Sequence, residues 1–347
     1  MNVNIALLLA QDGIANGLIY ALLALALLLV FMVTRVLFVP AGEFVMLGAL
    51  TLATLQKGLF PPTVWLLATM GGAMALSETW ILWRTGDWRQ WRARMLLALG
   101  APVLGGLMAA WLAPQKPPLG VQICLTLMLV APIAPILYRI AFRPLASASV
   151  LVLLFAAMAV HYALMGLGLY FFGAEGVRTP PFVPGRIDVG FTRVSWHLLI
   201  VLGVAVVLMA LLWLLFTRTL RGKALRATAV NRVGARLVGI RPESAGLAAF
   251  AIAGFIATLS GVLIAPLTAI YYDSGFLVAL RGFVGAVVGG MASFPLAVAG
   301  ALLVGLVESY AAFFQSAFKE ALVFALLVPI LMWRSAVEGG GQHEEEE

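Results

Sequence analysis

Charged residues are scarce in this chain, and long apolar runs occupy most of its length. Only 11% of the 347 residues are charged and 63% are hydrophobic, whereas a soluble domain carries about 25% charged residues. A soluble protein of this composition would expose a very large apolar surface to water. The composition therefore excludes an ordinary soluble domain and predicts an all-α, polytopic membrane protein.

Cysteine and histidine are also rare. Cys124 is the single cysteine, and the three histidines, His161, His197 and His343, fall in different regions. This pattern excludes a disulfide framework and a cysteine metal site, and we expect no metal in this chain. His161 lies within an apolar run, where we expect a hydrogen-bonded, helix-packing role.

Sequence signatures of an energy source are missing as well. Residues 221–224, Arg-Gly-Lys-Ala, lack the upstream glycine and the Ser or Thr of a phosphate-binding loop. A proton-driven carrier places acids within its spans, and the candidates here are only Glu43, Glu78, Asp273 and Glu308. We therefore expect no enzyme activity, no cofactor in this chain, and dependence on a cytoplasmic partner.

What the chain does contain is a series of uncharged runs, each a candidate span, because a span needs about 20 apolar residues. Run 13–34 is too long for the core of a signal peptide and is interpreted as a retained span. Run 44–56 is short, so we expect a tilted or broken span there. The remaining runs are 58–77, 95–115, 117–138, 144–174, 194–217, 244–272 and 282–307.

A last apolar part, 309–333, is interrupted by Lys319 and Glu320. Together these runs predict about ten or eleven spans of roughly 20 residues each. We interpret 1–336 as a single transmembrane domain and 337–347, which ends in four glutamates, as a disordered acidic tail.

Positive charge is concentrated in one loop, residues 217–243, where seven basic residues face a single acid, Glu243. Basic loops of membrane proteins face the cytoplasm, so this charge indicates topology and not nucleic-acid binding. The same side is then assigned to the loops at Arg35, 84–94 and 139–147, and the outer side to 113–120 and 173–195. Eleven spans place the N-terminus outside and the C-terminus in the cytoplasm.

Part of this loop has the pattern of an amphipathic helix. Leu225, Ala229, Val233 and Leu237 recur every four residues, which is the spacing of one helix face. The other faces carry Arg226, Asn231, Arg232 and Arg236. A helix of this kind between two spans suggests docking to a cytoplasmic protein, and the alternative is a helix that lies on anionic lipid.

Five segments, in order over about two thirds of the chain, carry a resemblance to a known family. The segments are Ala41-Gly42-Glu43 with Met46-Leu47-Gly48; Arg139 with Arg143-Pro144-Leu145; residues 222–227 with Asn231, Ala235 and Gly239-Ile240; Gly254, Gly261 and Pro266; and Gly289-Gly290 with Gly300, Gly305 and Glu308. With these segments the chain resembles the permease subunits of branched-chain amino acid ABC importers.

The resemblance implies a division of labour among several proteins. Two related permease subunits would form the path, two ATPase subunits would bind ATP and Mg²⁺ on the cytoplasmic side, and an external binding protein would deliver the substrate. Residues 223–240 would form the helix that contacts the ATPase. The contact residues would be Lys223, Leu225, Arg226, Asn231, Arg232, Arg236 and Gly239.

The chain also departs from this family. Residues 37–41 read Leu-Phe-Val-Pro-Ala, where many relatives carry Asn and a His or Gln, which affects the expected substrate if those groups line the path. Residues 80–120 look like an added pair of helices with a tryptophan-rich loop. Its tryptophans are Trp80, Trp83, Trp88 and Trp91, and an interfacial aromatic belt is their expected role.

Three charged residues within apolar segments are candidates for the translocation path or for a structural ion pair. A charge at mid-membrane costs about 2.5–3.5 kcal/mol on insertion scales, so Glu308 needs a partner, and Arg281 is the expected one. Glu43 follows Gly42 near the start of the second span, where it is expected to stabilise the helix N-terminus or to line the inner gate.

Glycines are frequent toward the C-terminus, and Gly285 and Gly289 form a literal GxxxG motif, which permits close helix contact. The glycines to which we assign a helix-packing role are Gly282, Gly285, Gly289, Gly290, Gly300 and Gly305.

The sequence thus predicts a permease subunit of an ATP-driven importer in the bacterial inner membrane. Its expected substrate is a branched-chain amino acid or a related small amide or carboxylate. Two alternatives remain. An ion- or proton-coupled secondary transporter would show inverted repeats and mid-span acids, and a membrane enzyme acting on a lipid-linked substrate would show clustered acids or histidines.

Overall fold

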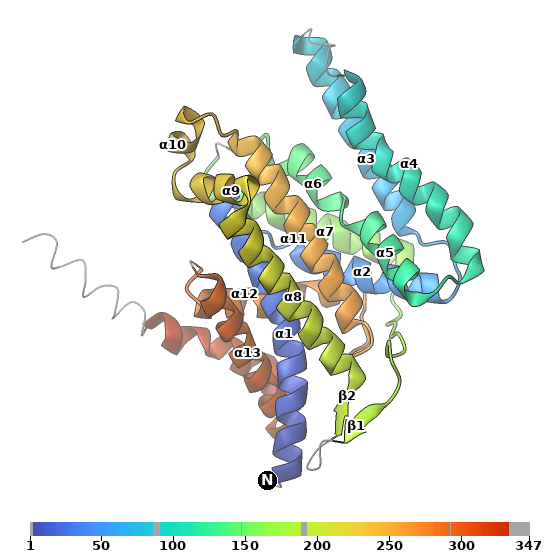
Figure 1. Ribbon diagram of the computed structural model, residues 1–347, viewed down its shortest axis with the longest axis vertical. Coiled ribbons are helices and arrows are strands. Elements are labelled where there is room, and N and C mark those ends of the chain that lie inside the picture. Colours follow the sequence, from blue (N-terminus) through green and yellow to red (C-terminus); the bar gives the residue numbers. More distant parts are fainter. Residues whose placement is uncertain (1–2, 86–90, 147, 189–192, 292, 333–347) are drawn as a thin grey trace, which may run out of the picture. The chain divides into compact units, whose positions relative to one another are not determined.

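The computed structural model describes residues 3–85, 91–146, 148–188, 193–291 and 293–332. Within these ranges the secondary structure is helical except for one antiparallel pair of short strands (Figure 1). The elements are α1 (Val3–Thr34), α2 (Ala41–Gln56), α3 (Thr63–Thr85), α4 (Trp91–Leu112), α5 (Leu119–Val130), α6 (Ile133–Leu137), α7 (Val150–Phe172), β1 (Arg186–Asp188), β2 (Arg193–Ser195), α8 (Trp196–Arg218), α9 (Leu220–Val230), α10 (Arg232–Leu237), α11 (Pro242–Ile264), α12 (Ser274–Val288), α13 (Phe294–Phe314) and α14 (Lys319–Ala325).

The described residues also include short helical turns. They are the 3-10 helices η2 (Ala113–Gln115) and η4 (Ser316–Phe318) and the π-helix η3 (Tyr138–Phe142). The predicted acidic tail, 337–347, and His343 within it lie outside the described residues.

Six helical segments of the described residues are long and apolar enough to cross a membrane. They are Asn4–Thr34, Leu119–Phe142, Val150–Phe172, Trp196–Arg218, Pro242–Ile264 and Phe294–Phe314. The prediction of a polytopic helical membrane protein is confirmed. The predicted number of ten or eleven spans is reached only by adding the shorter apolar helices α2 and α12 together with α3, α4 and α14.

The chain is divided between two compact units. Unit 1 comprises Met1–Leu28, Val183–Ala205 and Leu280–Glu347, and unit 2 comprises Leu29–Phe182 and Val206–Ala279. Helices α1, α8 and α12 therefore contribute residues to both units. The interpretation of 1–336 as a single transmembrane domain stays a prediction.

In unit 2, glycines let α2 and α11 approach closely. A Cβ added at Gly48 would lie 2.6 Å from Thr258 O, and one at Gly261 would overlap the backbone of Val45. The 16 residues of α2 span only about 24 Å at 1.5 Å per residue, less than the roughly 30 Å of a bilayer's hydrocarbon core. Because almost all of α2 is buried, protein rather than lipid surrounds this short helix.

Aromatic rings fill the core of unit 2 just before α2. Phe38 is fully buried, and its ring centroid lies 4.7 Å from that of Phe250 and 5.7 Å from that of Phe44. Phe142 completes the cluster, 5.3 Å from Phe250. The segment 37–41 therefore contributes a packed core side chain at Phe38.

In unit 1, the C-terminal glycines lie where helix backbones meet. A Cβ added at Gly285 would lie 2.6 Å from Ala301 Cα, and one at Gly282 would lie 2.7 Å from Leu23 Cβ. Gly289, Gly300 and Gly305 are each packed against the backbone of another helix. Close helix packing at these five glycines follows directly from the missing side chain.

Gly290 has a different role from the helix-packing one assigned to it. It has a φ of 80°, and its N–H donates to Val287 O over 2.8 Å. A left-handed glycine in this position is a helix C-terminal cap. Gly290 therefore helps to end α12, and the double-glycine pattern does not distinguish a cap from a contact.

Helices α3 and α4 form an antiparallel hairpin within unit 2 (Figure 1). Gly71 permits its close packing, because a Cβ there would lie 2.6 Å from Ala98 O. Trp80 and Trp83 are exposed, and the Arg84 guanidinium lies 4.0 Å from the ring centroid of Trp80. Trp88 lies outside the described residues. The proposed origin of 80–120 as an addition stays a prediction.

Candidate functional site

The basic hairpin, residues 217–243, consists of two helices. Thr219 begins α9, where its hydroxyl accepts a hydrogen bond from Gly222 N over 3.0 Å. Asn231 ends α9 and begins α10, with φ −148° and ψ 106°, and its Oδ1 accepts from Gly234 N over 2.9 Å. The prediction of one amphipathic helix over 223–240 is therefore wrong, because Asn231 caps a second helix instead of continuing the first.

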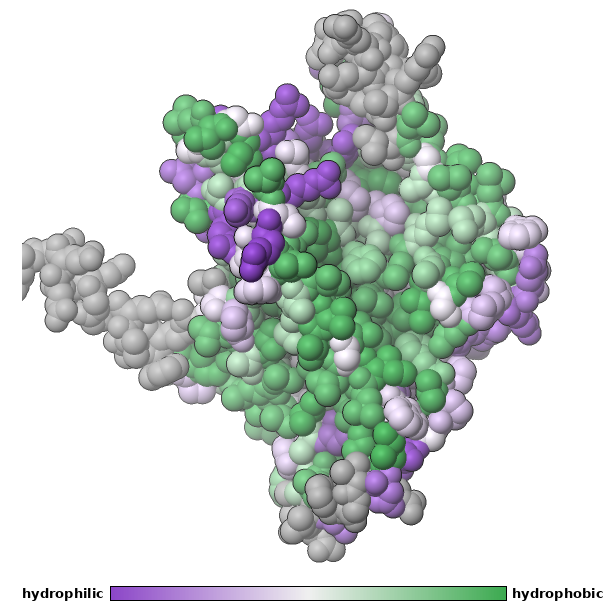
Figure 2. Space-filling model, in the orientation of Figure 1, coloured by the Kyte–Doolittle hydropathy of each residue, from purple (hydrophilic) through white to green (hydrophobic). Residues whose placement is uncertain are grey.

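This break divides the predicted apolar stripe. Leu225 is 2% exposed and packs against the body of unit 2, whereas Leu237 is 84% exposed. Val230, Val233 and Val238 are also exposed. We call these four exposed residues, Val230, Val233, Leu237 and Val238, the hairpin tip. Figure 2 shows hydrophobic and hydrophilic side chains next to one another over α9 and α10.

The charged residues of the basic hairpin are mostly turned to solvent. Lys223, Arg226 and Arg236 are exposed, and Arg236 Nη2 lies 3.3 Å from Glu243 Oε1 in a surface ion pair. Arg232 is half-buried, and its Nε has no hydrogen-bond partner within the described ranges. The hairpin thus presents an apolar tip beside exposed cations.

Gly239 closes the hairpin. It has a φ of 85°, and the following N–H, that of Ile240, donates to Ala235 O over 2.9 Å. This is the hydrogen-bond pattern of a glycine-capped helix end. Gly239 therefore fixes how α10 returns toward α11, and its role as a partner contact stays a prediction.

Helix α11 separates the two ends of unit 2. Its 23 residues span about 34 Å at 1.5 Å per residue, close to the thickness of a bilayer core. The basic hairpin precedes Pro242, and Thr179 N donates to Ala265 O over 3.1 Å just beyond the other end. The hairpin and segment 177–182 therefore lie at opposite ends of α11, as the loop assignment requires. The end that faces the cytoplasm stays a prediction.

Unit 2 buries an acid and a histidine in contact. Glu43 is completely buried in the first turn of α2, and its Oε1 lies 2.9 Å from Nδ1 of the buried His161 on α7. The His161 ring centroid lies 4.9 Å from that of Phe276. Glu43 Oε2 has no hydrogen-bond partner among the residues that the structure describes.

The sequence predicted a hydrogen-bonded, helix-packing role for His161, and a hydrogen bond is present. Glu43 was expected at the helix terminus or the inner gate, and its contact with His161 was not predicted. A signal was present, because a buried acid and a buried histidine in an apolar chain each need a polar partner. The role of Glu43 in a translocation path stays a prediction.

Unit 1 contains a cluster of charged residues around Arg281. Arg281 Nη2 lies 3.0 Å from Glu308 Oε1 and 3.4 Å from Glu320 Oε1, and the Tyr20 hydroxyl donates to Glu308 Oε2 over 2.7 Å. The expected pairing of Arg281 with Glu308 is therefore present. The role of Arg281 and Glu308 in lining a translocation path stays a prediction.

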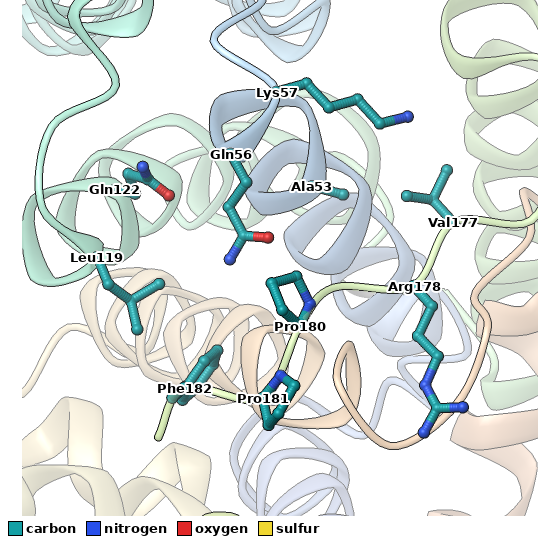
Figure 3. Close-up of a pocket in the computed structure, with 10 residues that line it drawn as sticks. All are labelled: Ala53, Gln56, Lys57, Leu119, Gln122, Val177, Arg178, Pro180, Pro181 and Phe182. Carbon is teal, nitrogen blue, oxygen red and sulfur yellow. The ribbon is translucent and has the colours of Figure 1, made fainter. Parts of the chain in front are cut away.

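A cavity of about 520 Å³ lies at the end of unit 2 opposite the basic hairpin. It is bounded by the C-terminus of α2, the start of α5 and segment 177–182 (Figure 3). Its polar lining consists of Gln56, Lys57, Gln122 and Arg178. None of these four polar residues was a predicted site residue, because their positions converge only in the fold.

Metal ligands do not gather in the described part of the chain, which contains no group of three or more His, Cys, Asp or Glu side chains placed to hold an ion. The expectation that this chain holds no metal and no cofactor stays a prediction.

Comparison with known families gives one family-model match. The model described as "Branched-chain amino acid transport system / permease component" matches residues 92–331. This range includes the basic hairpin, Arg281 and Glu308. It begins after Glu43.

Curated relatives agree with this match. The chain is 28% identical over 203 residues to the high-affinity branched-chain amino acid transport system permease protein BraD of Pseudomonas aeruginosa, covering 56% of this chain and 66% of BraD. It is 28% identical over 201 residues to LivH, the equivalent permease protein of Escherichia coli, covering 56% and 65% of the two chains. The alignments thus span just under two thirds of these relatives. No solved structure matches the chain.

Proposed function

The chain belongs to the family of permease components of branched-chain amino acid transport systems, and from this premise we propose that it is a translocation subunit of an ATP-driven importer. It would form part of the path for a branched-chain amino acid or a related small amide or carboxylate, in the inner membrane of a bacterium. Its companions would be a second permease, two ATPase subunits that bind ATP and Mg²⁺, and an external binding protein.

The observation that carries this proposal is the hairpin tip. Val233 and Leu237 are exposed in a segment that stands beyond the membrane-length helix α11. Apolar side chains in that position gain stability only when another surface covers them. A groove on an ATPase subunit would cover the tip, while the exposed Arg226 and Lys223 would pair with acids at the rim of that groove.

Anionic lipid is the other surface that would suit a basic, apolar segment. Each basic residue near such a membrane contributes about 1 kcal/mol. The break at Asn231 argues against lipid, because a helix lying in the interface needs one continuous apolar face. Here Leu225 and Leu237 are turned to different surroundings, one to the protein core and one to solvent.

A second candidate function, a proton-coupled carrier, is favoured by one specific observation. Glu43 and His161 form a buried acid and histidine pair, and such intramembrane groups occur in proton relays. Among the described residues, no further titratable side chain is hydrogen-bonded to the pair, so these residues form no continuous hydrogen-bonded relay through it.

Reconstitution separates the two candidates. We expect vesicles containing this chain with its second permease, both ATPase subunits and the binding protein to accumulate radiolabelled leucine only with ATP and Mg²⁺. Vesicles containing this chain alone should stay inert, with or without a proton gradient. Accumulation by the isolated chain under a proton gradient would contradict the importer and favour the carrier.

A further inference from the structure

We propose that the cavity between α2, α5 and segment 177–182 is a binding site for a free α-amino acid in its zwitterionic form. This inference rests on the proposed function, because it names a place where the transported solute first meets this chain. The carboxylate would lie toward Lys57 and Arg178, and the ammonium group toward Gln122 Oε1.

Gln122 supplies the most specific observation. It is 7% exposed, and its Nε2 donates to Pro117 O over 2.8 Å. That hydrogen bond fixes the orientation of the amide, so Oε1 is the group turned inward. Oε1 is buried without a partner among the described residues. An unsatisfied buried acceptor is destabilising, and a donor such as an ammonium group would satisfy it.

The opposite pole of the cavity is positive. Lys57 and Arg178 both line it, and no acid does. Arg178 is held in place because its Nε donates to Pro266 O over 3.0 Å, which leaves its two terminal nitrogens for a ligand. Figure 3 shows the Gln122 carboxamide at the left of the cavity and the Lys57 and Arg178 side chains toward its right, with the Lys57 ammonium above and the Arg178 guanidinium below, pointing away from one another.

Apart from Gln56, the rest of the lining is apolar. Val177, Pro180, Pro181 and Phe182 lie along segment 177–182 and face the cavity. The volume of about 520 Å³ falls in the range of small-molecule sites, about 300–1,000 Å³. A cation pole, an acceptor pole and an apolar wall together match a carboxylate, an ammonium group and an aliphatic side chain.

Backbone hydrogen bonds attach segment 177–182 to the residues that follow α11. Val177 and Ile270 exchange two hydrogen bonds of 3.0 Å, and Thr179 N donates to Ala265 O over 3.1 Å. The wall is therefore tied to the end of α11 that lies farthest from the basic hairpin. Such a site would receive solute at one membrane face while the hairpin meets its partner at the other.

The test measures binding of radiolabelled leucine to the purified full chain in lipid nanodiscs, with leucinamide and isocaproate as competitors. Leucinamide lacks the carboxylate and isocaproate lacks the amine. We expect Lys57→Gln to raise the Kd for leucine about tenfold, equivalent to about 1.4 kcal/mol, while leaving competition by leucinamide unchanged. Gln122→Leu should weaken the binding of leucine but leave competition by isocaproate unchanged.

Lys116→Gln is the matched control, because Lys116 packs against Gly58 at the same end of unit 2 and does not line the cavity. Equal effects of Lys57→Gln and Lys116→Gln, or competition by isocaproate as strong as by leucine, would overturn the proposal. ATP-driven uptake by the complete transporter is measured in parallel. If the complete transporter takes up leucine but both cavity variants bind leucine as the unchanged protein does, the proposed site is refuted and the importer is not. If the unchanged complete transporter shows no ATP-driven uptake, the importer itself is refuted.

Discussion

Glu43 and His161 are 118 residues apart in the chain and share a hydrogen bond of 2.9 Å in the core of unit 2. The pair links the first turn of α2 to the middle of α7, and neither side chain has appreciable contact with solvent. Gly42 permits this arrangement, because a side chain there would overlap the backbone of Gly275. The start of α2 is thus fixed by one polar contact and one close backbone contact.

Removing the histidine should destabilise the protein strongly. In His161→Leu the Glu43 carboxyl would be buried without its hydrogen-bond partner, and an unsatisfied buried polar group costs about 1–3 kcal/mol. Glu43→Gln should cost less, because its amide can still form a hydrogen bond to the ring. The measurement is the thermal unfolding midpoint of the detergent-solubilised chain.

Tyr162→Leu is the control for this prediction, since Tyr162 neighbours His161 on α7 but is exposed. We expect its unfolding midpoint to stay close to that of the unchanged protein. Equal losses in His161→Leu and Tyr162→Leu would contradict the prediction, because they would show that the hydrogen bond between Glu43 and His161 contributes no more to stability than the exposed ring of Tyr162.

The sequence predicted those features that depend on local pattern. Uncharged runs 144–174 and 194–217 became α7 and α8, because a backbone in lipid must satisfy its own hydrogen bonds. The pairing of Arg281 with Glu308 was predictable for a related reason. A charge within an apolar run needs an opposite charge, and few are available in this chain.

Features that depend on convergence of distant segments were not predictable. The Glu43–His161 contact and the cavity beside Gln122 each join helices far apart in the chain, and no periodicity records such a meeting. The break at Asn231 was a missed local signal. A four-residue apolar spacing continues across it, but Asn is a favoured N-cap residue, and this preference decided the local structure.

Replacing glycine by alanine should have opposite effects on stability at helix contacts and at open positions. Gly285→Ala places a methyl group 2.6 Å from Ala301 Cα, so the helices must separate and stability should fall. Gly166→Ala meets nothing within 4 Å and should raise helix stability by up to about 1 kcal/mol. The fraction of monodisperse protein after stepwise heating measures both changes. Losses of similar size in the two variants would contradict this account.

The Arg281 cluster should behave as one network. Arg281→Gln leaves two carboxylates, Glu308 and Glu320, without their shared cation, whereas Glu308→Gln leaves Arg281 paired with Glu320. We expect the first change to destabilise more than the second. In the double variant Arg281→Gln with Glu308→Gln, the loss should be smaller than the sum of the single losses, with a coupling of about 0.5–3 kcal/mol. Additive losses in unfolding measurements would refute the coupling.

The last prediction concerns two leucines of the basic hairpin with the same exposure. Leu237 and Leu220 are each 84% exposed, but Leu237 belongs to the hairpin tip and Leu220 begins α9 next to the end of α8. Because neither is in the core, aspartate at either position should leave the unfolding midpoint nearly unchanged. If the tip enters a groove on the ATPase, Leu237→Asp should abolish co-purification of the ATPase subunits with the complete transporter, while Leu220→Asp retains it. If the hairpin instead lies on lipid, neither change should affect co-purification, and both should weaken the ordering of the hairpin by anionic vesicles in hydrogen exchange.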